Sequence, residues 1–367
     1  MDFELFNTYS NKTELFIPLD DNDIRIYACG PTVYDYIHVG NARPLIIFDV
    51  LVRFLKLIYP KVTYVRNITD VDDKIIVQAN QNKESINNLT ERTIKAFSDD
   101  ADALFVKKPD FEPRATEHIQ EMLKMIKVLL ENGNAYLSDG HVLFSVSSMP
   151  NYGKLSGMNL SEMIDGARVE ASDYKKEPAD FVLWKPSKTG ELGWHSDFGF
   201  GRPGWHIECS AMSEKYLGKQ FDIHAGGLDL IFPHHENEIA QSCCAFNTEF
   251  MAKYWMHNGY ITVNNEKMSK SEGNFITVRD ALKKHDGETI RYAILSGHYR
   301  SPIDFSFKAL KEAKSALDRL YRASENFEHD NVIDEEFLSC LSNDLNSPQA
   351  ISCLLYTSPS PRDLSTS

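Results

Sequence analysis

Residues 24–70 read IRIYACGPTVYDYIHVGNARPLIIFDVLVRFLKLIYPKVTYVRNITD and predict a strand, a helix and a second strand in that order. Residues 24–30 alternate apolar and polar side chains and stop at Gly-Pro, a pattern typical of a strand entering a loop. Residues 44–59 are apolar at helical spacing, and Pro44 suits a first helical turn. The β-branched segment 61–70 predicts the second strand. Because strands joined by so long a crossover run parallel, we expect a parallel sheet with right-handed connections.

Polar residues follow the predicted strands. Cys29 and His38 come after the first strand, and the pair Thr69–Asp70 ends the second. In doubly wound sheets, ligands bind beyond the carboxyl ends of the strands. The position of these residues therefore makes this half of the chain an active-site candidate.

The bulk composition excludes several classes of protein. The 367 residues are 42% hydrophobic and 25% charged, as expected of a globular chain long enough for two or three domains. The absence of an apolar run of about 18 residues and of a secretory signal predicts no membrane partner. Six cysteines without CxxC spacing favour a cytoplasmic location. The net charge of −14 argues against broad nonspecific nucleic-acid binding, without excluding a local basic surface.

The motif HVGN at 38–41 is a candidate phosphate site. It lies in a loop that opens a helix, where free backbone N–H groups and the helix dipole favour anions. His38 would stabilise charge on a triphosphate, and Gly40 would let a nucleotide approach the backbone closely. A single motif of this length is nonspecific.

The motif KMSKS at 267–271 is a second candidate phosphate site. Lys267 and Lys270 stand in a short polar loop with serines and a glycine. Two cations in such a loop suit a pyrophosphate leaving group, whose charge grows in the transition state. Taken alone, this segment could equally be a solvated turn. The two motifs together bracket the parallel-sheet pattern and predict a nucleotide site.

Four residues are candidate zinc ligands: Cys29, Cys209, His234 and Glu238. The last two are four residues apart on a predicted helix, so their side chains point the same way. Thiolate, imidazole and carboxylate groups all bind zinc, and this set would form a plausible tetrahedral site. Spacing alone leaves open the alternative that both cysteines are small buried residues.

The two phosphate motifs resemble HIGH and KMSKS, the signatures of the class I aminoacyl-tRNA synthetases. KMSKS is intact, whereas HVGN departs at its second and fourth positions, the latter being Asn41. The segments CGPTVYDYIHVGN, YVRNITDVDDKI, RPGWHIECSAM, FDIHAGGLDLIFPHHENEIAQS and WMHNGYITVNNEKMSKSEGN together resemble the cysteinyl-tRNA synthetase family. This resemblance runs in order from about residue 5 to residue 353.

The resemblance implies a zinc-dependent cysteine–tRNA ligase. ATP, accompanied by Mg²⁺, would activate L-cysteine to cysteinyl adenylate, and the cysteinyl group would pass to the 3′-terminal adenosine of tRNA(Cys). One Zn²⁺ per chain would read the substrate by binding its thiolate, a bond that serine cannot make. We expect the chain to be a monomer.

The resemblance also assigns roles to individual residues. Thr69, Trp205 and His224 would enclose the substrate cysteine, and His206, His224 and His235 would tune the metal. Cys243 and Cys244 are expected to be structural. The residues expected at ATP are His38, Gly40, Asn41, Asp229, Lys267, Ser269 and Lys270, of which His38, Lys267 and Lys270 are expected to be catalytic.

The expected fold class is α/β, a Rossmann-like doubly wound parallel sheet with an inserted connective domain, followed by a helical C-terminal region. The Asp139-Gly140 pair predicts a hairpin within the insertion. After the insertion the sheet is expected to resume with a helix at 204–217, a strand at 220–224, a helix at 233–246 and a strand at 254–263. The Ser/Thr/Pro-rich end looks like foreign adaptor sequence after a truncated bundle. The expected boundaries are a catalytic domain in two halves at 1–83 and 201–275, the insertion at 84–200, a linker similar to a stem-contact region at 276–307, an incomplete helical bundle at 308–355 and a disordered tail at 356–367.

Two alternatives remain open. A mycothiol-pathway cysteine ligase would share the adenylation site but use an amino-sugar acceptor. The excess of lysine (25) over arginine (14) suggests AT-rich coding and disfavours this alternative. A non-catalytic zinc or nucleotide-binding descendant is disfavoured by intact Lys267, Lys270 and all four metal candidates.

Overall fold

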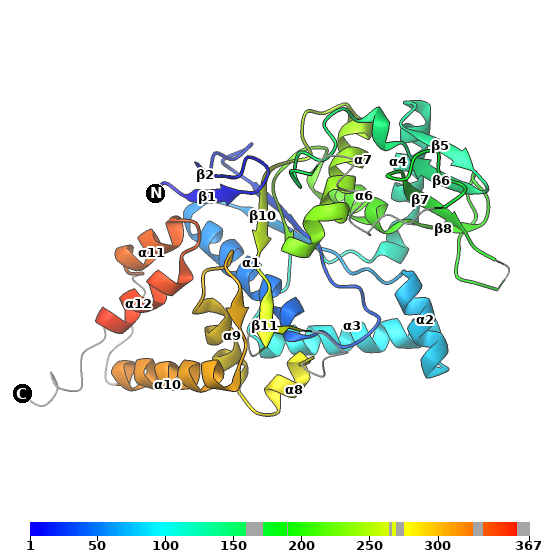
Figure 1. The fold of residues 1–367 in the computed structure, drawn as a ribbon. Coiled ribbons are helices and arrows are strands. Elements are labelled where there is room, and N and C mark those ends of the chain that lie inside the picture. The colour runs from blue at the N-terminus through cyan, green and yellow to red at the C-terminus, as the bar shows by residue number, and fades with distance from the viewer. Residues whose placement is uncertain (159–171, 189, 264–265, 269–274, 326–332, 358–367) are drawn as a thin grey trace, which may run out of the picture.

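The computed structural model describes residues 1–158, 172–188, 190–263, 266–268, 275–325 and 333–357 (Figure 1). Its centre is a sheet of four strands in the order β10-β9-β3-β4, and every neighbouring pair is parallel. These strands are β3 (Ile24–Ala28), β4 (Val62–Arg66), β9 (Phe221–Gly227) and β10 (Ala252–Asn258). The predicted α/β fold with a parallel sheet is therefore confirmed.

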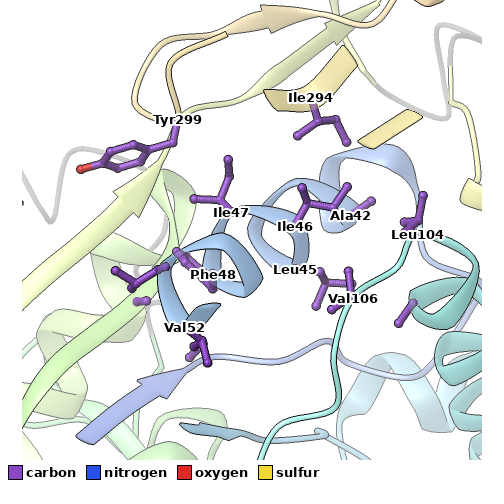
Figure 2. Packing of buried hydrophobic residues seen from close by; sticks show 14 of the residues in the cluster. Ala42, Leu45, Ile46, Ile47, Phe48, Val52, Leu104, Val106, Ile294 and Tyr299 are labelled. Atoms are coloured by element: carbon purple, nitrogen blue, oxygen red, sulfur yellow. The ribbon is translucent and has the colours of Figure 1, made fainter. Parts of the chain in front are cut away.

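Helix α1 (Val39–Ile58) is the crossover between β3 and β4. It begins five residues before the predicted start, because HVGN itself forms the first turn; Pro44 therefore lies inside the helix rather than in its first turn. Figure 2 shows α1 between Ile294 and Tyr299 of the C-terminal region on one side and Leu104 and Val106 on the other. Burial on several sides holds the HVGN end of the helix in a fixed place.

Arg43 ties α1 to two loops. Its side chain is fully buried, and Nη1 donates to the carbonyl of Tyr260 at 2.7 Å. Nη2 donates to the carbonyls of His298 and Ser301 at 3.1 and 2.5 Å. Burial lowers the pKa of Arg43 to about 10. The guanidinium still carries its proton at neutral pH and donates all three hydrogen bonds. It thereby joins the helix that starts at HVGN to the loops beside a second sheet.

That second sheet has the order β12-β11-β13 and contains the start of KMSKS. Its strands are β11 (Ile261–Val263), β12 (Glu266–Lys267) and β13 (Ile303–Asp304). The predicted single strand at 254–263 is wrong, because the chain leaves the central sheet at Gly259 and β11 belongs to the second sheet. A Cβ atom at Gly259 would lie 2.7 Å from the carbonyl oxygens of Arg300 and Ser301, so this corner requires glycine.

The predicted insertion contains helices and a separate antiparallel sheet, β5-β6-β7-β8. The Asp139-Gly140 turn has φ values of 46° and 74° and joins β5 to β6, which confirms the predicted hairpin. Figure 1 shows α6 and α7 between this sheet and the central one. The elements within the predicted bounds 84–200 are α3 (Ile86–Ala103), α4 (Ile119–Glu131), β5 (Ala135–Ser138), β6 (His141–Phe144) and β7 (Phe181–Pro186). Outside those bounds lie α2 (Asp73–Asn82), β8 (Gly201–Pro203), α6 (Trp205–Leu217) and α7 (Glu236–Phe246).

The C-terminal helices gather at the opposite end of the molecule from the β5–β8 sheet (Figure 1). Asp344 links them to the N-terminal hairpin, since its carboxylate accepts from the N–H of Phe6 at 2.9 Å and from the hydroxyl of Tyr299 at 2.6 Å. The elements of the N-terminal hairpin and the C-terminal region are β1 (Glu4–Asn7), β2 (Lys12–Leu15), α8 (Val278–Leu282), α9 (Gly287–Leu295), α10 (Phe307–Ser324), α11 (Glu335–Ser342) and α12 (Ser347–Thr357).

Most of the predicted tail, residues 358–367, falls outside the described residues. Among the described helices, none is both long and apolar enough to cross a bilayer. The predicted domain boundaries stay predictions.

Replacing Arg43 by Met is expected to lower the free energy of unfolding by about 3 kcal/mol, because three part-buried carbonyl groups lose the donor that the buried guanidinium supplies. Arg53→Met is the matched control: it lies on the same helix, its side chain is 44% exposed, and its ion pair with Asp49 is expected to contribute about 1 kcal/mol or less. Urea unfolding measures both variants. Equal losses for the two would contradict the anchoring role of Arg43.

Candidate active site and metal centre

The carboxyl edge of the central sheet gathers the four candidate metal ligands. Cys29 follows β3 directly, and Cys209 stands on α6. Helix α7 begins at Glu236, three residues later than predicted, so His234 lies in the turn Ile231–His235 before it and Glu238 in its first turn. The spacing of four residues still brings His234 Nε2 within 3.1 Å of Glu238 Oε1.

The donor atoms of these four residues have separations that fit a zinc ion. Cys29 Sγ lies 3.7 Å from Cys209 Sγ and 3.4 Å from Glu238 Oε1, and Cys209 Sγ lies 3.6 Å from His234 Nε2. A tetrahedral zinc with Zn–S bonds of about 2.3 Å and Zn–N and Zn–O bonds of about 2.0–2.2 Å needs donor separations of about 3.3–3.8 Å. All four donor atoms lie within 4.8 Å of one another. The side chains present therefore suit this metal.

A second set of donors overlaps the first. Cys29 and Glu238 also lie within 4.8 Å of ring nitrogens of His224 and His235. His224 Nε2 is 2.9 Å from Glu238 Oε2, and His235 Nε2 is 3.3 Å from Cys29 Sγ. The sequence predicted these two histidines as tuning groups and missed their capacity as ligands. The two adjacent histidines, His234 and His235, could have indicated a second potential metal ligand in this segment.

Burial controls the protonation of the cluster. It raises the pKa of the Cys29 thiol well above its ordinary value and that of Cys209 to about 11. It lowers the pKa of His234 well below its ordinary value and that of His206 to about 3. Neutral imidazole is the ligand form of histidine, and a coordinated thiol loses its proton to solvent. We therefore expect protons to compete with a metal for this site at low pH.

Further histidines and tryptophans orient the cluster. His206 Nδ1 lies 2.9 Å from His234 Nδ1, so one ring donates to the other. His235 Nδ1 lies 2.8 Å from His257 Nε2, and the ring of Trp255 stacks on that of His224 at 4.5 Å. The sequence analysis did not single out His257, although it ends β10 at the same edge as the other site residues. Each imidazole therefore has a neighbour that limits its rotation.

The residues expected to enclose the substrate border the metal cluster. Trp205 is 37% exposed, and its ring stacks on His234 at a centroid distance of 4.1 Å. The buried Thr69 hydroxyl donates to Glu208 Oε2 at 2.9 Å and accepts from Asn67 Nδ2 at 3.2 Å. Asn67 and Glu208 were missed, although Asn67 follows β4 and Glu208 precedes Cys209. Trp205 thus lies between the buried His234 and solvent.

The HVGN residues form a tight turn at the start of α1. His38 is the N-cap residue, and its N–H donates to Asn41 Oδ1 at 3.2 Å. A Cβ atom at Gly40 would lie 2.8 Å from the His38 ring and 3.2 Å from Met268 Cε, so the position requires glycine. Because Met268 belongs to KMSKS, the two predicted phosphate motifs meet here.

The other predicted nucleotide residues are only partly described. The backbone of Lys267 pairs with Thr262 across β12 and β11. Asp229 is exposed in a short turn (Leu228–Leu230) after β9, at the carboxyl edge of the sheet. Ser269 and Lys270 lie outside the described residues. The structure thus brings Gly40 of HVGN close to the Met268 side chain of KMSKS, while the second lysine of that motif lies outside the described residues.

Cys243 and Cys244 stand further along α7, beyond Glu238. Burial raises their pKa values, to about 12 for Cys243 and about 11 for Cys244. Neither belongs to a group of potential metal ligands among the described residues. Their predicted structural role stays a prediction.

Comparisons with known proteins agree with this geometry. Residues 15–315 match the family model of the class I (C) tRNA synthetase catalytic domain. The chain is 56% identical over 356 residues to a cysteine–tRNA ligase from Rhodospirillum centenum, covering 96% of this chain and 78% of that protein. It is 54% identical over 352 residues to the cysteine–tRNA ligase of Gluconobacter oxydans, covering 95% and 78%. The fold is similar to that of Mycobacterium tuberculosis methionyl-tRNA synthetase in complex with methionyl-adenylate, with a TM-score of 0.66, 15% identity, and coverage of 91% and 82%.

Because both donor sets contain Cys29, we expect Cys29→Ala to abolish stable zinc binding whichever set holds the ion. Cys243→Ala is the matched control, since it removes another buried thiol outside both sets. Zinc per chain, measured by mass spectrometry of the metal after gel filtration, should be about one for the parent and the control. A folded Cys29→Ala variant that retains zinc would contradict the metal site.

Proposed function

Since the chain belongs to the cysteine–tRNA ligase family of class I tRNA synthetases, we propose that this enzyme works in two steps at the edge of its central sheet. In the first, a carboxylate oxygen of cysteine attacks the α-phosphorus of ATP, and pyrophosphate leaves with the electrons of the broken P–O bond. In the second, the 2′-hydroxyl of the terminal adenosine of tRNA(Cys) attacks the adenylate carbonyl, its proton goes to solvent, and AMP leaves. The observation that carries this proposal is that the Cys/Cys/His/Glu cluster and the HVGN turn lie at the same edge of the central sheet, with Cys29 and HVGN both following β3.

We assign the metal to Cys29, Cys209, His234 and Glu238 rather than to the overlapping set. This set supplies two thiols, which favour zinc, and its donor separations suit a tetrahedron, whereas the overlapping set supplies one thiol. His234 and His235 are each oriented through the second ring nitrogen, by His206 and His257, so the number of thiols is what separates the two sets. Bound zinc would supply a Lewis acid that takes the substrate thiolate as a further ligand and discriminates against serine.

The protein's own groups would enclose the rest of the amino acid. Trp205 forms a wall beside His234, and Thr69 presents a hydroxyl oriented by Asn67 and Glu208. His224 Nε2–H donates to Glu238 Oε2, which leaves Oε1 directed toward the metal cluster. These contacts hold the ligands and the substrate wall in one arrangement, so little reorganisation is needed when cysteine binds.

The HVGN turn would hold the phosphates of ATP. The first N–H groups of α1 and its dipole favour an anion, and Gly40 lets the His38 ring and Met268 lie close to the backbone of the turn. His38 would donate to the oxygens that gain charge as pyrophosphate leaves, together with Lys267, Lys270 and Mg²⁺. Asn41, in place of the histidine of HIGH, caps the turn by accepting from the N–H of His38. We place Asp229 and Ser269 near the nucleotide on the strength of the family resemblance.

The two donor sets can be separated by single substitutions. We expect His234→Ala to lose zinc, because the assigned set keeps only three protein ligands. His235→Ala should retain about one zinc per chain with weaker affinity, since it removes contacts to Cys29 Sγ and His257 but none of the assigned ligands. Competition with a zinc chelator measures both affinities. The reverse result, with zinc held by His234→Ala and lost by His235→Ala, would move the site to the overlapping set.

The activity is tested by cysteine-dependent exchange of pyrophosphate into ATP. Lys270→Ala is expected to lower the exchange rate by about 10²–10³-fold, the scale for one preorganised charge donor. Lys215→Ala removes only a surface ion pair with Glu121 and should exchange normally. Absence of cysteine-dependent exchange in the zinc-loaded parent would refute the proposal.

The acceptor is tested separately. Cysteine should be transferred to tRNA(Cys) and not to the amino sugar of the mycothiol pathway, and acid-stable product analysis distinguishes the two. Transfer to the amino sugar alone would identify the enzyme as the alternative ligase.

A further inference from the structure

The segment Phe275–Arg279 lies along the HVGN turn as a short antiparallel partner. The N–H of Val39 donates to the carbonyl of Ile276 at 3.0 Å, and the N–H of Val278 donates to the carbonyl of Ile37 at 3.0 Å. His38 and Thr277 face each other in an antiparallel bridge. The ring of His38 packs edge-on against Phe275 at 5.0 Å. His38 is therefore held on both sides by a segment that lies more than 230 residues away in the chain.

Arg279 fastens this segment at its far end. Its guanidinium lies over the ring of Tyr36, 5.0 Å from the centroid, and Tyr36 is two residues before His38. Nη2 donates to the carbonyl of Ala96 on α3 at 3.1 Å, and Nε lies 3.2 Å from Asp100 Oδ1 on the same helix. Burial raises the pKa of Asp100 to about 6, so this carboxylate is ionised above pH 7. One side chain thus joins α8, α3 and the loop that leads into HVGN.

Helix α3 secures that loop at two further points. The hydroxyl of Thr93 donates to the carbonyl of Val33 at 2.7 Å. The guanidinium of Arg92 lies 5.8 Å from the same Tyr36 ring that Arg279 covers. The Tyr36 ring thus meets cations from two helices, and each cation–π contact at such a site contributes about 0.5–1 kcal/mol. Since these contacts converge on the residues before His38, the loop has little freedom to shift while Arg279 is in place.

We propose that Arg279 is a positioning residue for amino-acid activation, which acts by holding His38 in its place at the start of α1. This inference rests on the proposed role of His38 at the phosphates of ATP. Arg279 does not contact the nucleotide; it fixes the register between segment 275–278 and segment 37–39 through Tyr36 and α3. Loss of this side chain frees both segments to shift, and a shift of about 1 Å at a reacting group can cost up to about 10²-fold in rate.

The test measures exchange in zinc-loaded full-length chains carrying Arg279→Ala, His38→Ala or both substitutions. We expect Arg279→Ala to lower kcat/KM for ATP by about tenfold, with KM for cysteine and zinc content unchanged within about twofold. The double variant should be no slower than His38→Ala, because Arg279 acts through that residue. Lys283→Ala is the matched control on the neighbouring surface: it removes only an exposed pair with Asp280 and should leave kcat/KM unchanged.

A purely structural role would lower the melting temperature without changing kcat/KM for ATP at a temperature where the variant is folded. If Arg279→Ala did not fold, Arg279→Lys would carry the test. Lysine keeps the positive charge over Tyr36 but cannot bind the Ala96 carbonyl and the Asp100 carboxylate together, so an intermediate loss is expected.

Normal kcat/KM in the Arg279 variant, with His38→Ala impaired, would overturn the inference and leave the proposed function standing. Normal exchange in His38→Ala would overturn both the role of His38 and the inference. Additive losses in the double variant would show that Arg279 acts elsewhere, and would also overturn it.

Discussion

The parallel alignment of β3, β4, β9 and β10 is the constraint on which the rest of the structure depends. Parallel strands bring their carboxyl ends to one edge of the sheet. Residues that follow different strands therefore lie close together in space although they are far apart in the sequence. Cys29, Asn67, Asp229 and His257 come to this edge in that way. The helices that return from the sheet, α6 and α7, add Cys209 and Glu238 from the other direction. The position of the site is therefore determined by the order and direction of the strands rather than by any single side chain.

The metal cluster has an electrostatic consequence for the fold. Two thiols, a carboxylate and several imidazoles share a volume from which water is largely excluded. Burial raises the pKa values of the Cys29 and Cys209 thiols and lowers the pKa of His234, so these two thiols hold their protons and this imidazole remains uncharged. A divalent cation compensates the negative charge of thiolates and carboxylate together, and its binding free energy then adds to the stability of the folded chain. In this family, amino-acid selection and fold stability would thus depend on the same four side chains.

Helix α1 connects the nucleotide end of the site with the second sheet. Its first turn is HVGN, and Arg43, one turn further on, binds the backbone at Tyr260, His298 and Ser301. These loops flank β11 and β13, and β11 pairs with the strand that opens KMSKS. The two predicted phosphate motifs are therefore joined twice, through this buried arginine and through the pairing of Val39 with Ile276. These two attachments hold the HVGN turn in place.

Local pattern was enough to predict the parallel strand–helix–strand unit, the Asp139-Gly140 hairpin and the class of fold, because periodicity and turn chemistry report burial and backbone conformation within a few residues. It failed at two boundaries. Pro44 lies inside α1 because HVGN already forms the first turn, and the predicted strand at 254–263 is divided at Gly259 because residues 261–263 pair with the distant strand β13. The same reasoning named Cys29, Cys209, His234 and Glu238 only with the help of a family resemblance, since spacing alone also fitted buried cysteines. The overlapping donor set with His224 and His235, the contact of Asn67 and Glu208 with Thr69, and the Arg279 clamp on Tyr36 were decided by tertiary structure alone. Each of these contacts joins segments that are far apart in the sequence, so no local pattern predicts it. Which residues meet at the edge of the sheet depends on how the strands are ordered and packed.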